Sequence, residues 1–521
     1  MTISNFIKRG VEMSRNMKIR NFTPIDYQRK VLKKLVQKAS TTAFGTHYSY
    51  KQILKSEDLI QEFQENVPIF DYDSIHNQWW YRTLNEEENI CWPGKIKYFA
   101  LSSGTSGSPS KHIPITMDFI RAHRRGSLRL VASLPNYKVP TSFYSKGIML
   151  LGGSTALENK GGYYVGDLSG ITAKQVPFWF RPFYKPGVEI AAEKDWESRI
   201  TKIAYNAPKW DIGAIGGIPS WIQLLMERII EYHDVDTIHD IWPNLEIFVS
   251  GGINFEPYRK SFDRLSGKPL KIMDTYLASE GYVSIQTYPE AKGMTMMLNN
   301  GVFFEFVPFT ETNFDENGKV IGKPKALTIE DVEEGVDYAI LMSTNAGIWR
   351  YQLGDTVRFV DKEKSEIVIT GRTQHFLSIC GEHLSVMNMT DAVNKVSNDL
   401  DVDILEFTVS GIEHDNFFAH KWYIGCDESI DKSVFRIKLD ATLEELNADY
   451  ATERTAVLKD VIIEIIPTDI FYQWHAKNGK MGGQNKFPRV MKKDKFEEWE
   501  NFVKISNQGS VTVSLTKKNL G

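Results

Sequence analysis

The sequence predicts a layered α/β fold with a largely parallel sheet, followed by a smaller α+β region. Strand, turn and helix patterns alternate through the first half of the chain, as they do in sheets built from crossover units. From Met294 the pattern changes to alternating β segments, which predict hairpins in a small barrel or sheet. The polar segment 371–376 then precedes a region of mixed helices and strands. We therefore expect two domains, residues 1–372 and 373–521.

The composition is that of a globular, enzyme-sized protein. Its 521 residues suffice for two or more domains with ample cores. A net charge of −4 argues against nucleic acid as the main partner, and no stretch approaches the ~18 apolar residues of a membrane span. The N-terminus lacks the apolar core of a secretory signal, and three distant cysteines indicate neither a disulfide framework nor a metal knuckle. We expect a reduced, cytoplasmic, soluble monomer that binds neither nucleic acid nor membrane.

The elements of the first domain follow from start signals and apolar runs. Thr23-Pro24-Ile25-Asp26 combines a hydroxyl cap, a proline at the first helical position and an acid in the first turn, which predicts a helix through Ser40. Short apolar runs with glycine at their ends predict buried strands, and a proline after the second run begins a helix. These runs are residues 147–152, 210–217 and 245–252, and a further strand with a polar end covers residues 271–281.

The C-terminal region predicts a separate α+β unit. Leu405 to Cys426 has the pattern of a hairpin, Ala441 to Arg454 that of a helix, and Val461 to Ile466 that of a strand. Among the aromatic runs, Trp79-Trp80 and Phe178 to Tyr184 favour core packing over an apolar ligand pocket.

The most informative stretch is the loop from Leu101 to Lys111, Leu-Ser-Ser-Gly-Thr-Ser-Gly-Ser-Pro-Ser-Lys. A half-buried strand precedes it, and Thr116 can cap a helix from Met117 towards Val131. Glycines let the backbone approach a ligand, free N–H groups form an anion-binding concavity, and hydroxyls and a lysine bind phosphate oxygens. The loop has neither Walker A nor dinucleotide spacing, so a flexible Ser/Gly linker is an equal alternative to a phosphate cradle.

Other candidate ligand groups lie near predicted strand ends. Gly251-Gly252 and Ser279-Glu280 each end a strand, and ligands bind at the carboxyl ends of parallel strands, so these residues could converge with the loop. Asp355, at a predicted glycine turn, could accept two hydrogen bonds from a ribose diol, although a solvated turn aspartate fits equally well. Lys486, in a glycine-rich loop, is either a phosphate partner or a solvated charge.

Four motifs in order resemble those of the adenylate-forming enzyme superfamily: Ser102-Ser-Gly-Thr-Ser-Gly-x-x-x-Lys111, Tyr276-x-x-Ser-Glu280, Tyr351-x-x-Gly-Asp355 and Gly371-Arg372. Over nearly its whole length the chain is more closely similar to the auxin-responsive (Gretchen Hagen) acyl acid amido synthetases, including Gly483-Gln-Asn-Lys-x-Pro-Arg489. Gln352 departs from the pattern, because the superfamily usually has arginine there. The resemblance implies a large adenylate-forming N-terminal domain, with layered α/β sheets and a small β-barrel, and a smaller, mobile α+β C-terminal domain.

This resemblance also implies a ligase that forms an amide bond in two half-reactions. A carboxylate attacks the α-phosphate of ATP to give an acyl-adenylate and pyrophosphate, and an amino acid amine then attacks the acyl carbon and releases AMP. ATP and Mg²⁺ would be the cofactors, and a small carboxylic acid and an amino acid the substrates. The alternatives are an acyl-CoA ligase or other adenylate-forming ligase, and a non-catalytic nucleotide-binding protein.

The resemblance assigns roles to individual residues. Lys486 would bridge the carboxylate and the α-phosphate, where charge builds in the transition state, and Glu280 would hold Mg²⁺ as the second catalytic residue. The loop would hold the phosphates, Gly251-Gly252 would lie near adenine, and a rotation about residues 371–376 would let one site serve both half-reactions. The implied nucleotide-binding residues are Ser102, Ser103, Gly104, Thr105, Ser106, Lys111, Gly251, Gly252, Tyr276, Ser279, Glu280, Asp355 and Arg372.

Overall fold

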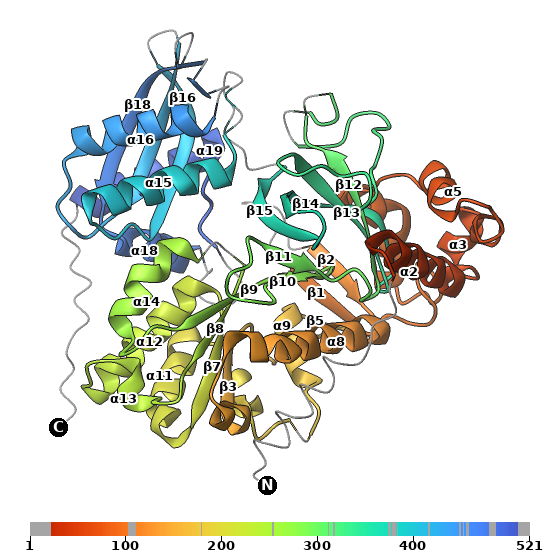
Figure 1. The fold of residues 1–521 in the computed structure, drawn as a ribbon, viewed down its shortest axis with the longest axis horizontal. Helices are drawn as coiled ribbons and strands as arrows, with labels where there is room; N and C mark the ends of the chain where they lie inside the picture. Colours follow the sequence, from red (N-terminus) through yellow and green to blue (C-terminus); the bar gives the residue numbers. More distant parts are fainter. Residues whose placement is uncertain are drawn as a thin grey trace. The chain divides into compact units, whose positions relative to one another are not determined.

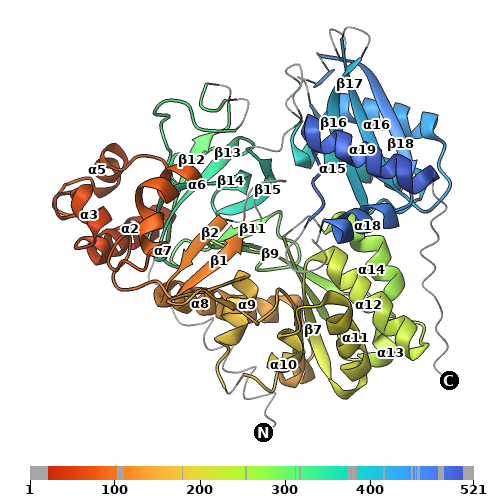
Figure 2. The same ribbon diagram turned by 180° about the vertical axis from the view of Figure 1, so that it is seen from behind.

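A computed structural model of the chain describes residues 22–102, 111–178, 180–252, 255–310, 312–315, 318–373, 377, 382, 384–414, 417–447, 450–451, 453–454, 458–478 and 486–508. The chain divides into two compact units. The first comprises residues 1–374 with 482–484, and the second comprises residues 375–481 with 485–521. Each unit has its own sheets and its own apolar cores (Figures 1 and 2).

An eleven-stranded sheet forms the centre of the first unit, in the order β12-β13-β14-β15-β11-β10-β9-β8-β7-β3-β6. Strands β3, β6, β7, β8 and β9 are parallel, and the others pair antiparallel. The parallel strands β3, β7, β8 and β9 coincide with the predicted strands, which confirms the α/β layer, whereas the short parallel strand β6 was not predicted. The strands are β3 (Gly147–Leu151), β6 (Tyr184–Lys185), β7 (Ile212–Gly217), β8 (Ile247–Gly251), β9 (Lys271–Ala278), β10 (Gly281–Ile285), β11 (Met294–Met296), β12 (Val302–Pro308), β13 (Asp337–Thr344), β14 (Ile348–Asp361) and β15 (Glu366–Arg372).

The antiparallel strands β12 to β15 belong to this same sheet. Of the two predicted forms, a small barrel or a sheet, the described strands therefore form a sheet. The predicted hairpin turn at Gly354-Asp355 is wrong, because β14 runs through both residues and Asp355 pairs with Arg372 of β15. Gly354 has a φ of 91°, so a glycine that resembled a turn signal instead allows an irregularity within a long strand. Strand β15 ends at Arg372 and so includes the first two residues of the polar segment 371–376.

A separate four-stranded sheet, in the order β2-β1-β5-β4, carries the Ser/Gly loop. It consists of β1 (Tyr98–Ser102), β2 (Lys111–Ile115), β4 (Glu158–Asn159) and β5 (Tyr164–Gly166). Strands β1 and β2 pair antiparallel, with Ser102 opposite Lys111, so the loop joins the two strands of a hairpin. The predicted strand before the loop and the predicted helix after it are both present, and the short strand β2, which was not predicted, lies between the loop and the helix. Residues 103–110 lie outside the described residues.

The helices of the first unit start at the predicted caps. Thr23 and Asp26 form a capping box at α2, and the Thr116 side chain accepts from the N–H of Phe119 at the start of α8. No helix in the described ranges is both long and apolar enough to cross a bilayer. The helices are α2 (Pro24–Ala39), α3 (Ala43–His47), α4 (Tyr50–Ile53), α5 (Leu59–Asn66), α6 (Tyr72–Ile75), the π-helix η1 (His76–Trp80), α7 (Tyr81–Leu84), α8 (Met117–Ser133), η2 (Leu134–Tyr137), η3 (Thr141–Ser145), α9 (Leu168–Lys174), α10 (Val188–Ala191), α11 (Trp196–Asn206), η4 (Ala207–Lys209), α12 (Pro219–His233), α13 (Ile238–Ile241), η5 (Glu256–Tyr258) and α14 (Arg259–Leu265), where η2 to η5 are 3₁₀-helices.

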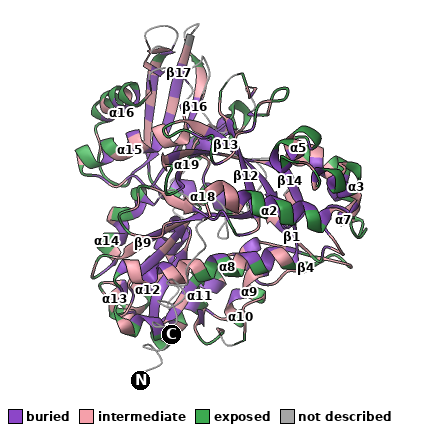
Figure 3. Ribbon diagram, turned by 45° about the vertical axis from the view of Figure 1, so that its right-hand side comes forward, coloured by how far each residue is buried: buried purple, intermediate pink, exposed green. Residues whose placement is uncertain are grey.

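The largest core of the first unit joins α2 to the antiparallel half of the sheet. Leu32 and Val36 are fully buried in it together with strand residues such as Phe303 (Figure 3). Trp80 also belongs to this core, which confirms the packing prediction for the tryptophan pair. The core prediction is wrong for Phe178, which is 80% exposed because it lies in a turn after α9 rather than on a buried face.

The second unit is a three-stranded sheet with helices on both faces. Trp422 packs into the core that includes α15 and α16, and Tyr423 packs into the core that includes α18 and α19, because successive residues of a strand point to opposite faces. The predicted hairpin and final strand are confirmed, but the predicted helix Ala441–Arg454 is displaced, since Asp431 caps α16 well before it. The elements are α15 (Val386–Leu400), β16 (Glu406–His414), β17 (Phe417–Gly425), α16 (Lys432–Leu446), β18 (Leu458–Ile466), α18 (Asp469–Lys477) and α19 (Lys493–Gln508).

Candidate functional site

Asp355 accepts hydrogen bonds from two other predicted site residues. The Tyr276 hydroxyl donates to Oδ2 at 2.6 Å, and the Arg372 Nε donates to Oδ1 at 2.9 Å. These three side chains come from β9, β14 and β15, which the large sheet brings together. Asp355 raises the pKa of Arg372, and burial together with Asp355 raises the pKa of Tyr276. The Arg372 side chain is still 48% exposed, so it can meet a ligand as well as Asp355.

Glu280 lies at the turn between β9 and β10 and is only 5% exposed. Burial raises the pKa of its carboxyl to about 7, and the charge of Asp355 adds to this rise. The backbone N–H of Glu280 itself, Lys111 and Arg372 act in the opposite direction. Within the described ranges, that N–H gives the only hydrogen bond to this carboxylate. A buried carboxylate with so few donors is suited to binding a cation. Ser279, beside it, is 9% exposed.

Lys111 joins this cluster from the start of β2. Burial lowers the pKa of its ammonium, Glu280 opposes this effect, and Arg372 adds to it. The ammonium lies 5.4 Å from the centre of the Tyr72 ring, and the Tyr72 hydroxyl accepts a hydrogen bond from the backbone N–H of His112 at 2.9 Å. Lys111, Glu280 and Arg372, predicted from three separate motifs, therefore interact electrostatically in one region.

The segment Asp71 to Asp73 is part of this region although no sequence motif marks it. Both aspartates raise the pKa of Lys111. Asp71 caps α6 through the N–H of Ser74 and pairs with Lys319 at 3.2 Å. The segment reaches the site because the preceding residue, Phe70, bridges to β14. A contact between such distant parts of the chain leaves no local pattern that sequence reasoning could detect.

Gln352 is held by two hydrogen bonds of its side-chain amide. The Gln352 amide Nε2 donates to the oxygen of Gly318 at 2.7 Å and to the hydroxyl of Thr373 at 3.2 Å, so this residue connects β14 to the end of β15.

Gly251 pairs with Thr275, and a Cβ at Gly251 would lie 3.0 Å from the Thr275 hydroxyl oxygen. Gly252 has a φ of 91°, which favours glycine. Gly251 thus ends β8 beside the strand that carries Tyr276, and Gly252 follows it.

Among the remaining predicted residues, Ser102 adjoins this cluster through its pairing with Lys111 across the β1–β2 hairpin. Ser103, Gly104, Thr105 and Ser106 lie outside the described residues, as do residues 374–376 of the expected hinge. Ser102 is the last residue of β1. Lys486 belongs to the second unit, where it is exposed.

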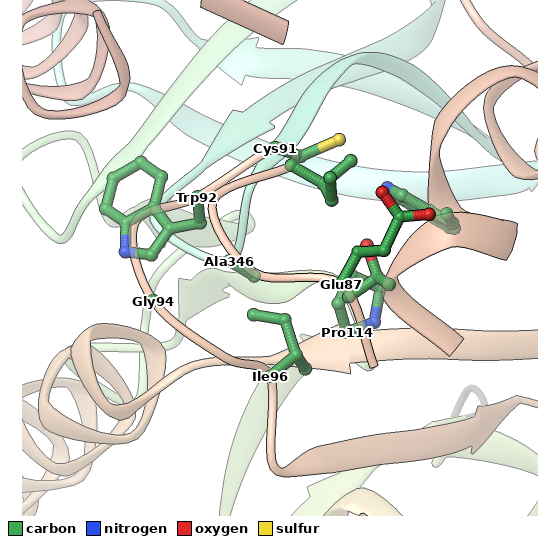
Figure 4. Close-up of a pocket in the computed structure, with 10 residues that line it drawn as sticks. Glu87, Cys91, Trp92, Gly94, Ile96, Pro114 and Ala346 are labelled. Atoms are coloured by element: carbon green, nitrogen blue, oxygen red, sulfur yellow. The ribbon is translucent and has the colours of Figure 1, made fainter. Parts of the chain in front are cut away.

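Trp80 is among the residues that line a small pocket. The Trp80 and Tyr351 rings stack with centroids 5.8 Å apart, and burial together with the charge of Glu280 raises the pKa of Tyr351. The pocket is lined mainly by apolar side chains, including Cys91, Trp92 and Ile96 (Figure 4). We assign no ligand to it, because the cluster described above does not line it.

Within the described ranges, no group of three or more histidine, cysteine, aspartate or glutamate side chains is arranged to hold a metal ion. Mg²⁺ is commonly held by one or two carboxylates together with substrate phosphates. A single buried carboxylate such as that of Glu280 is compatible with this mode of binding.

Three family models match the chain in order. They are the GH3 family N-terminal domain at residues 17–207, the GH3 family central domain at residues 295–372 and the GH3 family C-terminal domain at residues 387–495.

Curated relatives are similar over parts of the chain. The indole-3-acetic acid-amido synthetase GH3.3 of Arabidopsis thaliana is 22% identical over 452 residues, which are 74% of this chain and 72% of the relative. The probable indole-3-acetic acid-amido synthetase GH3.6 of Oryza sativa subsp. japonica is 29% identical over 140 residues, which are 26% of this chain and 28% of the relative.

Solved structures share the fold over almost the whole chain. The GH3.15 acyl acid amido synthetase has a TM-score of 0.75 at 17% identity, covering 97% of this chain and 96% of that protein. A 2-hydroxyisobutyryl-CoA ligase in its postadenylation state has a TM-score of 0.59 at 12% identity, covering 93% and 92%. The fold is thus that of adenylate-forming ligases, and with all three domain models matched in order, the chain belongs to the GH3 family.

Proposed function

We propose that this protein is an ATP-dependent acyl acid amido synthetase, a ligase that forms a carbon–nitrogen bond. It activates a small carboxylic acid as the acyl-adenylate with release of pyrophosphate. It then transfers the acyl group to the amine of an amino acid with release of AMP. Membership of a family whose similar members are named amido synthetases supports the amide product over the thioester of an acyl-CoA ligase.

The observation that carries this proposal is the group formed by Tyr276, Asp355 and Arg372 beside Glu280 and Lys111. It offers a carboxylate for a ribose diol, a guanidinium and an ammonium for phosphates, and a buried carboxylate for a cation. A nucleotide polyphosphate with its metal ion has all the complementary groups.

Each residue has a proposed role. Asp355 accepts from the ribose hydroxyls, and Arg372 binds the ribose or a phosphate. Lys111, with the loop residues Ser102, Ser103, Gly104, Thr105 and Ser106, binds the phosphates, while Gly251 and Gly252 lie against adenine, where a side chain would obstruct the ring. Tyr276 orients Asp355 through its hydrogen bond, and Ser279 contacts the nucleotide beside Glu280.

Glu280 is the proposed ligand of Mg²⁺. Its buried carboxyl, with a pKa raised to about 7, fits a divalent cation because the cation would supply the positive charge that the surrounding protein provides only in part. Bound there, Mg²⁺ would offset negative charge on the phosphates. Glu280 must then be ionised, so binding of Mg²⁺ and ATP releases a proton near neutral pH.

Lys486 is the proposed catalytic lysine of adenylation, since its charge would be most useful while negative charge builds on the α-phosphate. We further propose that residues 1–372 form the adenylation domain and residues 373–521 a mobile C-terminal domain that changes position between the half-reactions. The protein would act in the cytoplasm as a monomer, with no nucleic acid or membrane partner.

The decisive experiment is ATP–pyrophosphate exchange by the purified chain across a panel of carboxylic acids. Acids that support exchange are then incubated with ATP and each amino acid, or with ATP and CoA. The proposal predicts acid-dependent exchange and an amide product. A thioester with CoA and no amide would identify an acyl-CoA ligase instead. If none of the acids supported pyrophosphate exchange, a non-catalytic nucleotide-binding protein would be favoured.

A further inference from the structure

Arg350, the residue before Tyr351, forms a buried ion pair with Glu305. Their side chains are 6% and 1% exposed, and the Arg350 Nε lies 3.1 Å from each carboxylate oxygen. The Nη2 of Arg350 donates to Oε1 at 2.9 Å. This fork geometry satisfies the guanidinium and the carboxylate together. The charges of Arg350 and Glu305 therefore balance each other, whereas the charge of Glu280 is balanced only in part by the surrounding protein.

The remaining nitrogen of Arg350 fixes a different part of the chain. Its Nη1 donates to the oxygens of Gln64 at 2.8 Å and Val67 at 2.6 Å, at the end of α5 and just beyond it. The Gln64 side chain in turn donates to Glu305 at 2.9 Å. Arg350 thereby connects strands β12 and β14 to the segment that leads towards Asp71.

The backbone of Arg350 holds the same segment. The N–H of Phe70 donates to the Arg350 oxygen at 3.0 Å, and the N–H of Gln352 donates to the Phe70 oxygen at 2.8 Å. Arg350 has a φ of 39°, a conformation that a residue with a side chain rarely adopts, and the Ser343 hydroxyl accepts from its N–H at 2.9 Å. The side-chain bonds thus maintain an unusual backbone position that orients both Phe70 and Tyr351.

From these contacts we propose that Arg350, with Glu305, is a positioning pair for the nucleotide site. On one side it fixes residues 67–70, which lead into Asp71 and the Tyr72 ring beside Lys111. On the other side it fixes β14 just before Asp355. Neither member of the pair touches substrate. The pair sets the separation between the groups for phosphate and the group for ribose, and this inference rests on the proposed function.

The double variant Arg350→Met/Glu305→Leu separates positioning from stability. It removes both charges and retains apolar volume, so the unpaired buried charge that makes single substitutions so destabilising is avoided. The matched control is Arg358→Met/Asp337→Leu, which removes a two-bond ion pair, 2.8 and 3.0 Å, between β14 and its neighbour β13, away from residues 64–73. ATP affinity with Mg²⁺ is measured by calorimetry, and stability by urea unfolding.

We expect both double variants to fold, with ATP affinity reduced at least about tenfold only when the Arg350 pair is replaced. Affinity equal to that of the control would overturn the inference. If the double variant does not fold, Arg350→Lys decides, because a lysine keeps the charge beside Glu305 but cannot also supply the bonds to Gln64 and Val67. A folded Arg350→Lys protein with wild-type ATP affinity would equally overturn it. Wild-type protein that binds no ATP would instead refute the proposed function.

Discussion

Two buried polar side chains of the first unit, Gln28 and Glu280, differ in how their polar atoms are satisfied. Gln28 is 1% exposed; its Nε2 donates to the oxygens of Leu298 and Val302 at 2.7 and 3.0 Å, and its Oε1 accepts from the N–H of Phe304 at 2.7 Å. Glu280 has only its own backbone N–H as a hydrogen-bond donor among the described residues. The Gln28 side chain joins α2 to β12, whereas the Glu280 carboxylate has a charge that the fold does not balance.

This difference separates polar groups that serve the fold from polar groups that serve a ligand. A buried group whose hydrogen bonds are complete contributes to stability, whereas an unbalanced buried charge opposes folding. Charges of the second kind are concentrated at functional sites. Glu280 and Lys111 both have pKa values displaced by burial, and they interact with each other and with Arg372. The comparison therefore predicts opposite results when the two kinds of residue are replaced.

The largest expected effect is on rate, in the variant Lys486→Met. Loss of one preorganised charge contact should reduce ATP–pyrophosphate exchange by about 2.7–4 kcal/mol, or roughly a hundred- to a thousandfold. Transfer from preformed acyl-adenylate to an amino acid should persist, because the lysine is needed only while the carboxylate attacks the α-phosphate. Lys493→Met, at an exposed lysine at the start of α19, is the control. Equal loss of both half-reactions would mean that Lys486 serves the fold.

Glu280→Gln should stabilise the unliganded protein and slow adenylation. The folded pKa of about 7 lies above the ordinary value of 4.5, so the folded state binds the extra proton and wild-type stability falls as pH rises from about 4.5 to about 7. Above this range the ionised carboxylate costs about 3 kcal/mol, which glutamine avoids. Urea unfolding at pH 5 and pH 8 measures this: the variant should be more stable at pH 8 and nearly equal to wild type at pH 5. A variant less stable at both values would contradict the account.

Gln28→Ala should have the reverse profile. It leaves the buried Phe304 N–H without its side-chain acceptor, at a cost of about 2–3 kcal/mol in the free energy of unfolding. ATP affinity should be unchanged in the folded protein, because, among the residues that the structure describes, the Gln28 side chain bonds only to main-chain groups of residues 298–304. Denaturation and calorimetry on the same preparation measure both quantities. A large loss of ATP affinity would remove the distinction between the two residues.

The fold was predictable where the signals are local. The caps at Thr23 and Thr116 and the parallel strands β7 and β8 each follow from a few neighbouring residues. Errors occurred where long-range pairing outweighs a local signal. Gly354 resembles a turn, but pairing of the flanking residues with β15 carries β14 through it.

The site was predictable as a set of motifs but not as an arrangement. Tyr276 and Arg372 were assigned separately, and their shared bond to Asp355 arises from the sheet order. The residues Asp71 to Asp73 and the ion pair of Arg350 have no motif, because their positions depend on the bridge between Phe70 and β14 and on the bonds from Arg350 to residues 64 and 67, which join segments more than two hundred residues apart along the chain.

Calorimetric titration of ATP with Mg²⁺ into wild-type protein and Asp355→Ala tests the central claim most directly. Hydrogen bonds to a charged group contribute about 1.5–3 kcal/mol, so the variant should bind ATP roughly ten- to a hundredfold more weakly. Asp337→Ala, an aspartate paired with arginine elsewhere in the same sheet, should bind ATP like wild type. Equal ATP affinity in Asp355→Ala and wild type would contradict the assignment of this cluster as the nucleotide site.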